Sequence, residues 1–268
     1  GRDRANPDRD ERDLGWVAAV TDRGLRHRSN EDAMAVTTIG RAVIGVVCDG
    51  VSTTPGSAFA ARAAADAALG TLRRAVGSGG DLTDAMTRAV AAAQGAAGAV
   101  AAADPENPPA CTFVAAIGDA THVVVGWLGD SRAYWLDGRS GERLTLDDSW
   151  AAELVAAGLM TEGDAEADAR AHRITRWLGA DAPSGDVNVV VFKPPGPGWL
   201  VVCSDGLWNY GSTPDVLAPL LTGPQGGHDT PLHAARRLCE FALSSGGHDN
   251  ITVIVARMEG REDDDVPV

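Results

Sequence analysis

Cysteine is scarce in this chain of 268 residues, and no Cys-x-x-Cys pair is present. Zinc sites of the paired-cysteine type and dithiol redox centres are therefore not expected. The histidines other than His27 also lack the His-x-x-x-His spacing of a metal site. The cysteines are widely spaced, and most lie in apolar β-like runs, so we interpret them as small core residues in a reducing compartment. They are Cys48, Cys111, Cys203 and Cys239.

Positive charge and long apolar segments are scarce as well. The chain has 23 Lys and Arg against 37 Asp and Glu, which gives a formal net charge of −14 at pH 7. An acidic surface does not attract nucleic acid or an anionic membrane, so we expect neither as a partner. No apolar stretch approaches the roughly 18 residues of a membrane span, and the chain does not open with a signal-peptide pattern. We therefore expect a cytoplasmic protein.

The apolar pattern predicts a layered α+β fold, because short β-like runs surround paired long helices. The predicted strands are 14–21, 33–39, 42–48, 111–117, 121–128, 132–136, 186–192, 198–204 and 250–257. The predicted helices are 57–76, 82–103 with Asp81 or Thr83 as its cap, one from Ser149 to Gly158, and one from Thr230 to about Gly246. Residues 1–13 and 259–268 are charged and aperiodic, which is typical of a linker and an acidic tail around one domain at 14–258.

Three aspartates lie at the edges of apolar β-like runs: Asp49, Asp205 and Asp249. One Asp-Gly after a strand would be an ordinary turn. Several carboxylates that converge at one sheet edge, however, are costly to desolvate and repel one another unless a cation neutralises them. Oxygen ligands suit hard divalent ions such as Mg²⁺ or Mn²⁺. The recurrence therefore predicts a metal site that draws on both ends of the chain.

Two further motifs accompany these aspartates: Gly129-Asp130-Ser131-Arg132, between two β-like runs, and Arg26-His-Arg-Ser-Asn-Glu-Asp32 near the N-terminus. As an ordered set, the five segments resemble the metal-dependent protein phosphatases, the PPM or 2C-type serine/threonine phosphatases of bacteria. The resemblance runs from about Gly15 to Arg257. It implies a four-layer αββα sandwich, in which two antiparallel sheets are flanked by helices and the metal site lies at one edge. The stretch 147–181 corresponds to a flap beside that site.

The resemblance also implies a role for each motif residue. Asp49 and Asp205 would be inner ligands of two Mn²⁺ or Mg²⁺ ions, together with the Gly50 carbonyl and Asp249. Asp32 would hold metal-bound water. Asp130 would either help to bind a third, weaker ion or be only a hairpin turn residue. Two such ions would lower the pKa of a bridging water from about 15.7 towards about 7 and clamp an in-line displacement at phosphorus.

The chain departs from the family pattern at three places. His27 stands where relatives usually carry an arginine that grips the substrate phosphate, and histidine is only partly charged and offers fewer donors. Arg26 or Arg28 could take over this role, or all three could be solvated surface residues. Val51 stands where some relatives have a general-acid histidine, so that metal-bound water or His27 would protonate the leaving group. Ala110-Cys111-Thr112 replaces the Gly-Thr-Thr of the family.

We therefore predict a monomeric serine/threonine protein phosphatase that hydrolyses phosphoserine and phosphothreonine with a water bridging two divalent metal ions. Its partners would be phosphorylated proteins and a cognate serine/threonine kinase pathway. Two alternatives stay open. The altered His27 and Val51 favour a PPM-like regulatory or phosphoprotein-binding module with low turnover. A purely structural cation site would bind metal without hydrolysis.

Overall fold

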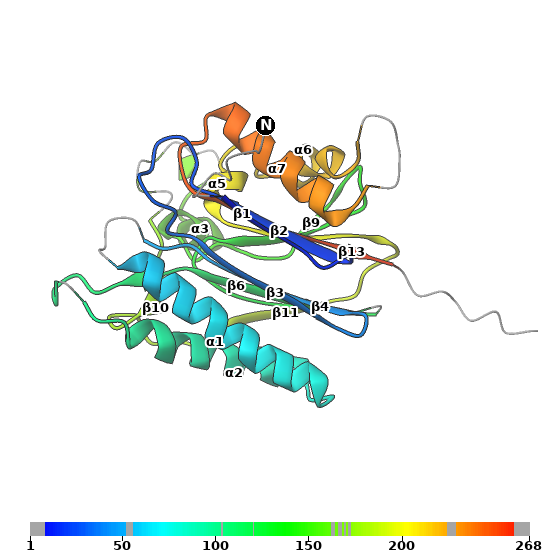
Figure 1. The fold of residues 1–268 in the computed structure, drawn as a ribbon. Coiled ribbons are helices and arrows are strands. Elements are labelled where there is room, and N and C mark those ends of the chain that lie inside the picture. The colour runs from blue at the N-terminus through cyan, green and yellow to red at the C-terminus, as the bar shows by residue number, and fades with distance from the viewer. Residues whose placement is uncertain are drawn as a thin grey trace, which may run out of the picture.

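The computed structural model describes residues 9–51, 56–102, 104–119, 121–161, 164–165, 168, 170, 173–223 and 229–259. Two antiparallel sheets pack face to face, and helices cover both outer faces (Figure 1). The long pair α1 (Ser57–Gly77) and α2 (Leu82–Gly98) lies on one side, and α7 (Pro231–Ser245) lies on the other. The predicted αββα sandwich is therefore confirmed. None of the helices in these ranges is both long and apolar enough to cross a membrane.

The order of the strands brings the two ends of the chain together. The first sheet runs β1 (Arg9–Asp13), β2 (Val17–Asp22), β13 (Ile251–Met258), β12 (Gly198–Cys203), β8 (Arg132–Leu136) and β9 (Gly141–Arg143). The second runs β11 (Asn188–Phe192), β7 (Val123–Leu128), β6 (Phe113–Gly118), β4 (Ala42–Cys48) and β3 (Ala33–Ile39), and β10 (Leu178–Gly179) pairs separately with β5 (Ala110–Cys111). Because β2 is hydrogen-bonded to β13, one site can include residues from both ends.

The helices begin where local capping predicts. The side chains of Asp81, Ser149 and Thr230 accept backbone N–H groups at the starts of α2, α3 (Trp150–Ala156) and α7. Of the two candidates for the α2 cap, Asp81 is therefore the correct one. Short helices in the described part of the chain include α5 (Asp205–Trp208), α6 (Pro214–Leu217) and the 3₁₀ helix η1 (Ala218–Leu221). Helix α2 ends five residues before the predicted boundary of 103.

Central strands are buried on both faces, which explains their continuous apolar runs. Along β12, Val201 points into the core beneath α7, and its neighbour Val202 points into the core between the two sheets. On the opposite side, Ile44 and Phe113 pack against the alanine-rich faces of α1 and α2. Alanine permits close approach of helix and sheet, so the chain builds this layer from small side chains.

The first described residues correct one expectation. Arg9–Asp13, predicted to be part of a linker, form β1 and pair with β2 along their whole length. All five residues are charged, so no apolar alternation marks the strand. Its stability comes from tertiary contacts instead, because the Glu11 carboxylate accepts hydrogen bonds of 2.6 and 3.0 Å from Arg236 on α7. A charged edge strand also discourages pairing with another chain. Residues 1–8 and 260–268, the rest of the predicted linker and nearly all of the acidic tail, lie outside the described residues.

Candidate active site

Antiparallel pairing places the ends of several strands at one edge of the sandwich. Ala33 at the start of β3 faces Cys48 at the end of β4, and Cys203 at the end of β12 faces both Arg132 and Val253. The five predicted acidic residues flank these strand ends. Asp32 precedes β3, Asp49 follows β4, Asp130 precedes β8, Asp205 starts α5 after β12, and Asp249 precedes β13.

The five carboxylates influence one another strongly. Burial raises the pKa of Asp49 well above its ordinary value, and the charges of the other four raise it further. Burial and three of these neighbours do the same to Asp205. Burial also raises the pKa of Asp32 to about 6 and that of Asp130 to about 7, with Asp249 adding to both. The structure therefore brings all five predicted acidic residues into one electrostatic unit.

Two oxygen atoms in this unit lack a hydrogen-bond donor. Asp32 Oδ1 and Asp205 Oδ1 are buried and have no partner among the described residues. Buried polar atoms are usually paired, and an oxygen-only cluster with unpaired carboxylate oxygens fits a hard divalent cation. No three acidic, histidine or cysteine side chains of the described residues are spaced as a finished metal shell. A bound cation would relieve the mutual repulsion of these carboxylates.

A chain of hydroxyl groups fixes the second oxygen of Asp32. Ser204 Oγ and Thr252 Oγ1 donate to Asp32 Oδ2 at 2.8 and 2.7 Å. Since Thr252 uses its hydrogen on Asp32, Thr21 donates to Thr252 Oγ1 at 2.7 Å and accepts from Asn30 Nδ2 at 2.8 Å. Ser204 is therefore a support for Asp32 rather than a nucleophile. Sequence reasoning missed Thr21 and Thr252, because threonine is common in strands.

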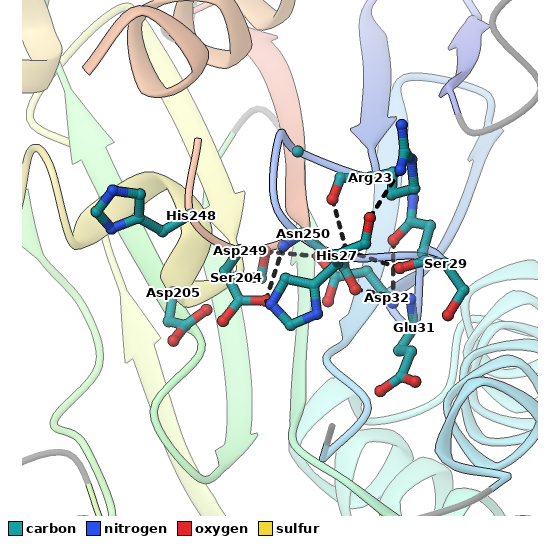
Figure 2. A network of polar contacts seen from close by, with 12 residues as sticks. Arg23, His27, Ser29, Glu31, Asp32, Ser204, Asp205, His248, Asp249 and Asn250 are labelled. Carbon is teal, nitrogen blue, oxygen red and sulfur yellow. Dashed lines mark hydrogen bonds and ion pairs between the residues drawn. The ribbon is translucent and has the colours of Figure 1, made fainter. Parts of the chain in front are cut away.

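Asn250 holds the N-terminal loop against Asp249. Its Oδ1 accepts from the Glu31 amide at 2.7 Å, and its Nδ2 donates to the carbonyls of Arg23 and Ser29 at 2.8 and 3.1 Å (Figure 2). A β-carbon on Gly206 would lie 1.9 Å from the Asn250 carbonyl oxygen. Only glycine permits this approach, so the Asp-Gly sequence after β12 brings the start of α5 against the segment that carries Asp249.

Asp49 is held from the side of β5. Its amide donates to Thr112 Oγ1 at 3.1 Å, and its carbonyl accepts from the Thr112 amide at 2.8 Å. Thr112 Oγ1 also lies 2.7 Å from Ser131 Oγ, next to Asp130. The threonine that the chain retains from the Gly-Thr-Thr pattern therefore links two of the acidic segments. Gly50 is buried against Glu31, and a β-carbon added at Gly50 would lie 2.7 Å from the Glu31 carbonyl oxygen.

His27 reaches the acidic cluster with its side chain. Its Nε2 lies 3.2 Å from Asp249 Oδ1, and its carbonyl accepts from Arg23 Nη1 at 2.7 Å. Figure 2 shows the His27 ring turned towards Asp249. Arg26 and Arg28 on either side are exposed, and neither forms an ion pair with another described residue. The three predicted phosphate contacts therefore differ: the histidine is engaged with a carboxylate, whereas the arginines face solvent.

The backbone of Asp130 is fastened to α5. Trp208 Nε1 donates to the Asp130 carbonyl at 2.9 Å, and the Arg132 guanidinium stacks on the Trp208 ring at 3.6 Å from its centroid. Asp147 holds Arg132 through bonds of 2.6 and 2.9 Å. Since α5 begins at Asp205, this stack fixes the separation between Asp205 and Asp130.

The chain therefore forms a helix-flanked double sheet with an acidic cluster at its edge, and both ends of the chain supply residues to this cluster. The family model of protein phosphatase 2C matches residues 23–223. This match covers well over half of the chain, which therefore belongs to the protein phosphatase 2C family, as the motifs predicted.

Bacterial relatives agree with this assignment. The chain is 34% identical over 158 residues to the serine/threonine phosphatase stp of Listeria welshimeri, covering 56% of this chain and 57% of that protein. It is 30% identical over 244 residues to the serine/threonine protein phosphatase PstP of Mycobacterium tuberculosis, covering 89% of this chain and 44% of that protein. The chain thus spans about half the length of these relatives.

Solved structures show the same fold. The crystal structure of M. tuberculosis PstP superposes with a TM-score of 0.73 at 28% identity, covering 93% of this chain and 99% of that one. The catalytic domain of PstP in complex with two manganese ions gives a TM-score of 0.70 at 27% identity, again covering 93% and 99%.

Proposed function

We propose that this protein is a metal-dependent serine/threonine protein phosphatase that hydrolyses phosphoserine and phosphothreonine in proteins. The observation that carries the proposal is the set of five carboxylates at the strand ends of one sheet edge, two of them with an unpaired buried oxygen, in a protein phosphatase 2C family member. The names of the relatives support this activity.

The donor set suits two Mn²⁺ or Mg²⁺ ions. We assign Asp49, Asp205, Asp249 and the Gly50 carbonyl to these ions, Asp32 to the orientation of their water, and Asp130 to a third, weaker ion. The complex of PstP with two manganese ions supports the metal type. When bound, such ions lower the pKa of a water molecule and neutralise charge on the phosphate oxygens. The chain's own residues keep the carboxylates in place through Ser204, Thr252, Thr112 and Trp208.

The substrate phosphate needs local positive charge in a protein of net charge −14. His27 is engaged with Asp249, so Arg26 and Arg28 are better placed to contact an incoming phosphate. Arginine supplies a permanent charge and a bidentate fork for such contacts. We further propose that the protein acts in the cytoplasm as a monomer and reverses the action of a serine/threonine kinase on phosphorylated proteins.

Turnover of p-nitrophenyl phosphate and of a phosphothreonine peptide tests the proposal. Activity should appear with Mn²⁺, be lower with Mg²⁺, and vanish with excess EDTA. Undiminished turnover by the chelated protein would overturn the metal-dependent mechanism. Tight peptide binding with Mn²⁺ but no hydrolysis would instead support the second candidate, a low-turnover binding module. The contact between His27 and Asp249 and the aliphatic Val51 favour that candidate, whereas the retention of all five carboxylates favours the enzyme.

A further inference from the structure

The turn Gly129–Asp130 leaves little freedom to its backbone. Gly129 has φ of +98°, which side chains other than glycine rarely adopt. A β-carbon there would lie 2.9 Å from Thr112 Cγ2 and 3.3 Å from the Arg176 carbonyl oxygen. The turn is therefore enclosed between β5 and the segment before β10, and its orientation decides where the Asp130 carboxylate points.

Asp148 bonds to this turn with both its backbone and its side chain. The Asp148 amide donates to the Gly129 carbonyl at 2.9 Å, and Asp148 Oδ2 accepts from the Gly129 amide at 3.0 Å. The same carboxylate accepts two bonds, of 2.9 and 3.1 Å, from Asn188 Nδ2 on β11. The Asp148 carbonyl accepts from the Thr175 amide at 2.9 Å. One residue therefore joins the turn, β11 and the base of the predicted flap.

The charge of Asp148 is not taken up by a close ion pair. Its side chain is 13% exposed, and Arg176 Nη1 lies 3.8 Å from Asp148 Oδ1 while Arg176 Nη2 donates to the Asp186 carbonyl. The hydrogen-bond donors to the carboxylate are the Gly129 amide and Asn188, with Arg176 as its longer ion-pair partner, and charge-assisted bonds of this kind are stronger than neutral ones.

We propose that Asp148 is a positioning residue for Asp130. It holds the Gly129–Asp130 turn, and with it Asp130, at the acidic edge of the sandwich, and it ties this turn to β11 and to Thr175. The inference rests on the proposed function only in taking Asp130 as a ligand of the weakest ion. The Trp208 bond to the Asp130 carbonyl is independent of Asp148, so losing Asp148 should loosen the turn without detaching it from α5.

The experiment compares Asp148→Asn with the control Asp181→Asn. Asparagine keeps the shape of Asp148, but its NH₂ group would oppose one of the donors. Asp181 is an exposed carboxylate of the same segment that accepts from Trp177 Nε1 at 3.0 Å. Manganese binding is measured by calorimetry without substrate, and exchange of the Gly129 amide is followed by NMR. Neither measurement requires phosphatase activity, so an inactive wild-type protein would refute the proposed function and leave this test readable.

We expect Asp148→Asn to weaken the lowest-affinity Mn²⁺ site about tenfold, close to the lower end of what a hydrogen bond to a charged group supplies. Exchange of the Gly129 amide should accelerate by a similar factor, the tighter ions should bind within about twofold of wild type, and Asp181→Asn should change nothing. In an Asp130→Asn background, Asp148→Asn should have no further effect on metal binding, because it acts through Asp130.

Three results would overturn the proposal. The first is unchanged Gly129 exchange and unchanged Mn²⁺ affinity in Asp148→Asn. The second is an equal loss of affinity in the presence and absence of Asp130. The third is Mn²⁺ binding by the Asp130→Asn variant that equals Mn²⁺ binding by the wild-type protein. If circular dichroism shows Asp148→Asn to be unfolded, Asn188→Ala replaces it. That variant removes the one amide group that makes both Asn188 bonds and keeps the Gly129 bond. It should weaken binding of the same ion about threefold, and no effect there would again refute the proposal.

Discussion

Thr252→Val removes one hydroxyl from the support of Asp32 and keeps the shape of the side chain. Thr252 is fully buried on β13, where it donates to Asp32 Oδ2 at 2.7 Å and accepts from Thr21 at 2.7 Å. The variant therefore loses one charge-assisted and one neutral bond. Asp32 Oδ2 retains Ser204, and Thr21 retains Asn30, so neither atom becomes fully orphaned.

At about 1.5–3 kcal/mol for a bond to a charged group and about 1 kcal/mol for a neutral one, the free energy of unfolding should fall by about 2–4 kcal/mol. For a domain of this size, each kcal/mol lowers Tm by roughly 2–4 °C, so we expect a decrease of roughly 5–15 °C. Circular dichroism melts and urea titrations of the metal-free protein measure this change. Thr37→Val is the matched control, because Thr37 is a half-buried threonine on β3 with no side-chain hydrogen bond among the described residues. Equal stability of the two variants would refute the role of the hydroxyl network.

Three further predictions concern the acidic cluster and its rim. Asp205→Asn should reduce kcat with Mn²⁺ about a hundredfold or more, since loss of a metal ligand removes several kcal/mol of transition-state stabilisation. The circular dichroism spectrum should be retained. A kcat near that of the wild type would show that Asp205 only shapes the turn. Arg26→Ala or Arg28→Ala should raise KM for a phosphopeptide by about threefold to tenfold, equivalent to about 0.7–1.4 kcal/mol, and leave kcat unchanged; unchanged KM in both variants would remove this loop from the phosphate site. Burial in the folded protein raises the pKa of Asp32 from 3.8 to about 6 and that of Asp130 from 3.8 to about 7. The folded protein therefore binds these two protons more tightly than the unfolded chain does. The resulting gain in the free energy of unfolding is complete below pH 3.8 and is lost as the pH rises through 6 and 7. The metal-free protein should therefore melt at a lower temperature at pH 7 than at pH 5, and Mn²⁺ should raise Tm more at pH 7; a metal-free Tm that does not fall over this range would contradict the shifts.

Local chemistry determined much of the fold from the sequence alone. A strand buried on both faces must be apolar throughout, so Ala42–Cys48 and Gly198–Cys203 were predictable from composition. Helix caps act within three residues, which is why Asp81, Ser149 and Thr230 marked their helices. The Asp residues at strand ends were visible for the same reason, because strand and turn signals are both local.

Tertiary structure decided the contacts that give these residues their environment. The charged strand β1 has no local signal, since its stability comes from pairing with β2 and from Arg236 on α7. Thr252 and Asp32 are 220 residues apart in the chain, and Ser204 and Asp32 are 172 apart. His27 stands at the predicted phosphate-binding position, and its side chain lies against Asp249. This contact depends on the start of β13 lying beside the N-terminal loop. Hydrogen bonds and electrostatic shifts depend on distances of a few ångström, and only the packing of the sheets sets those distances between residues remote in sequence.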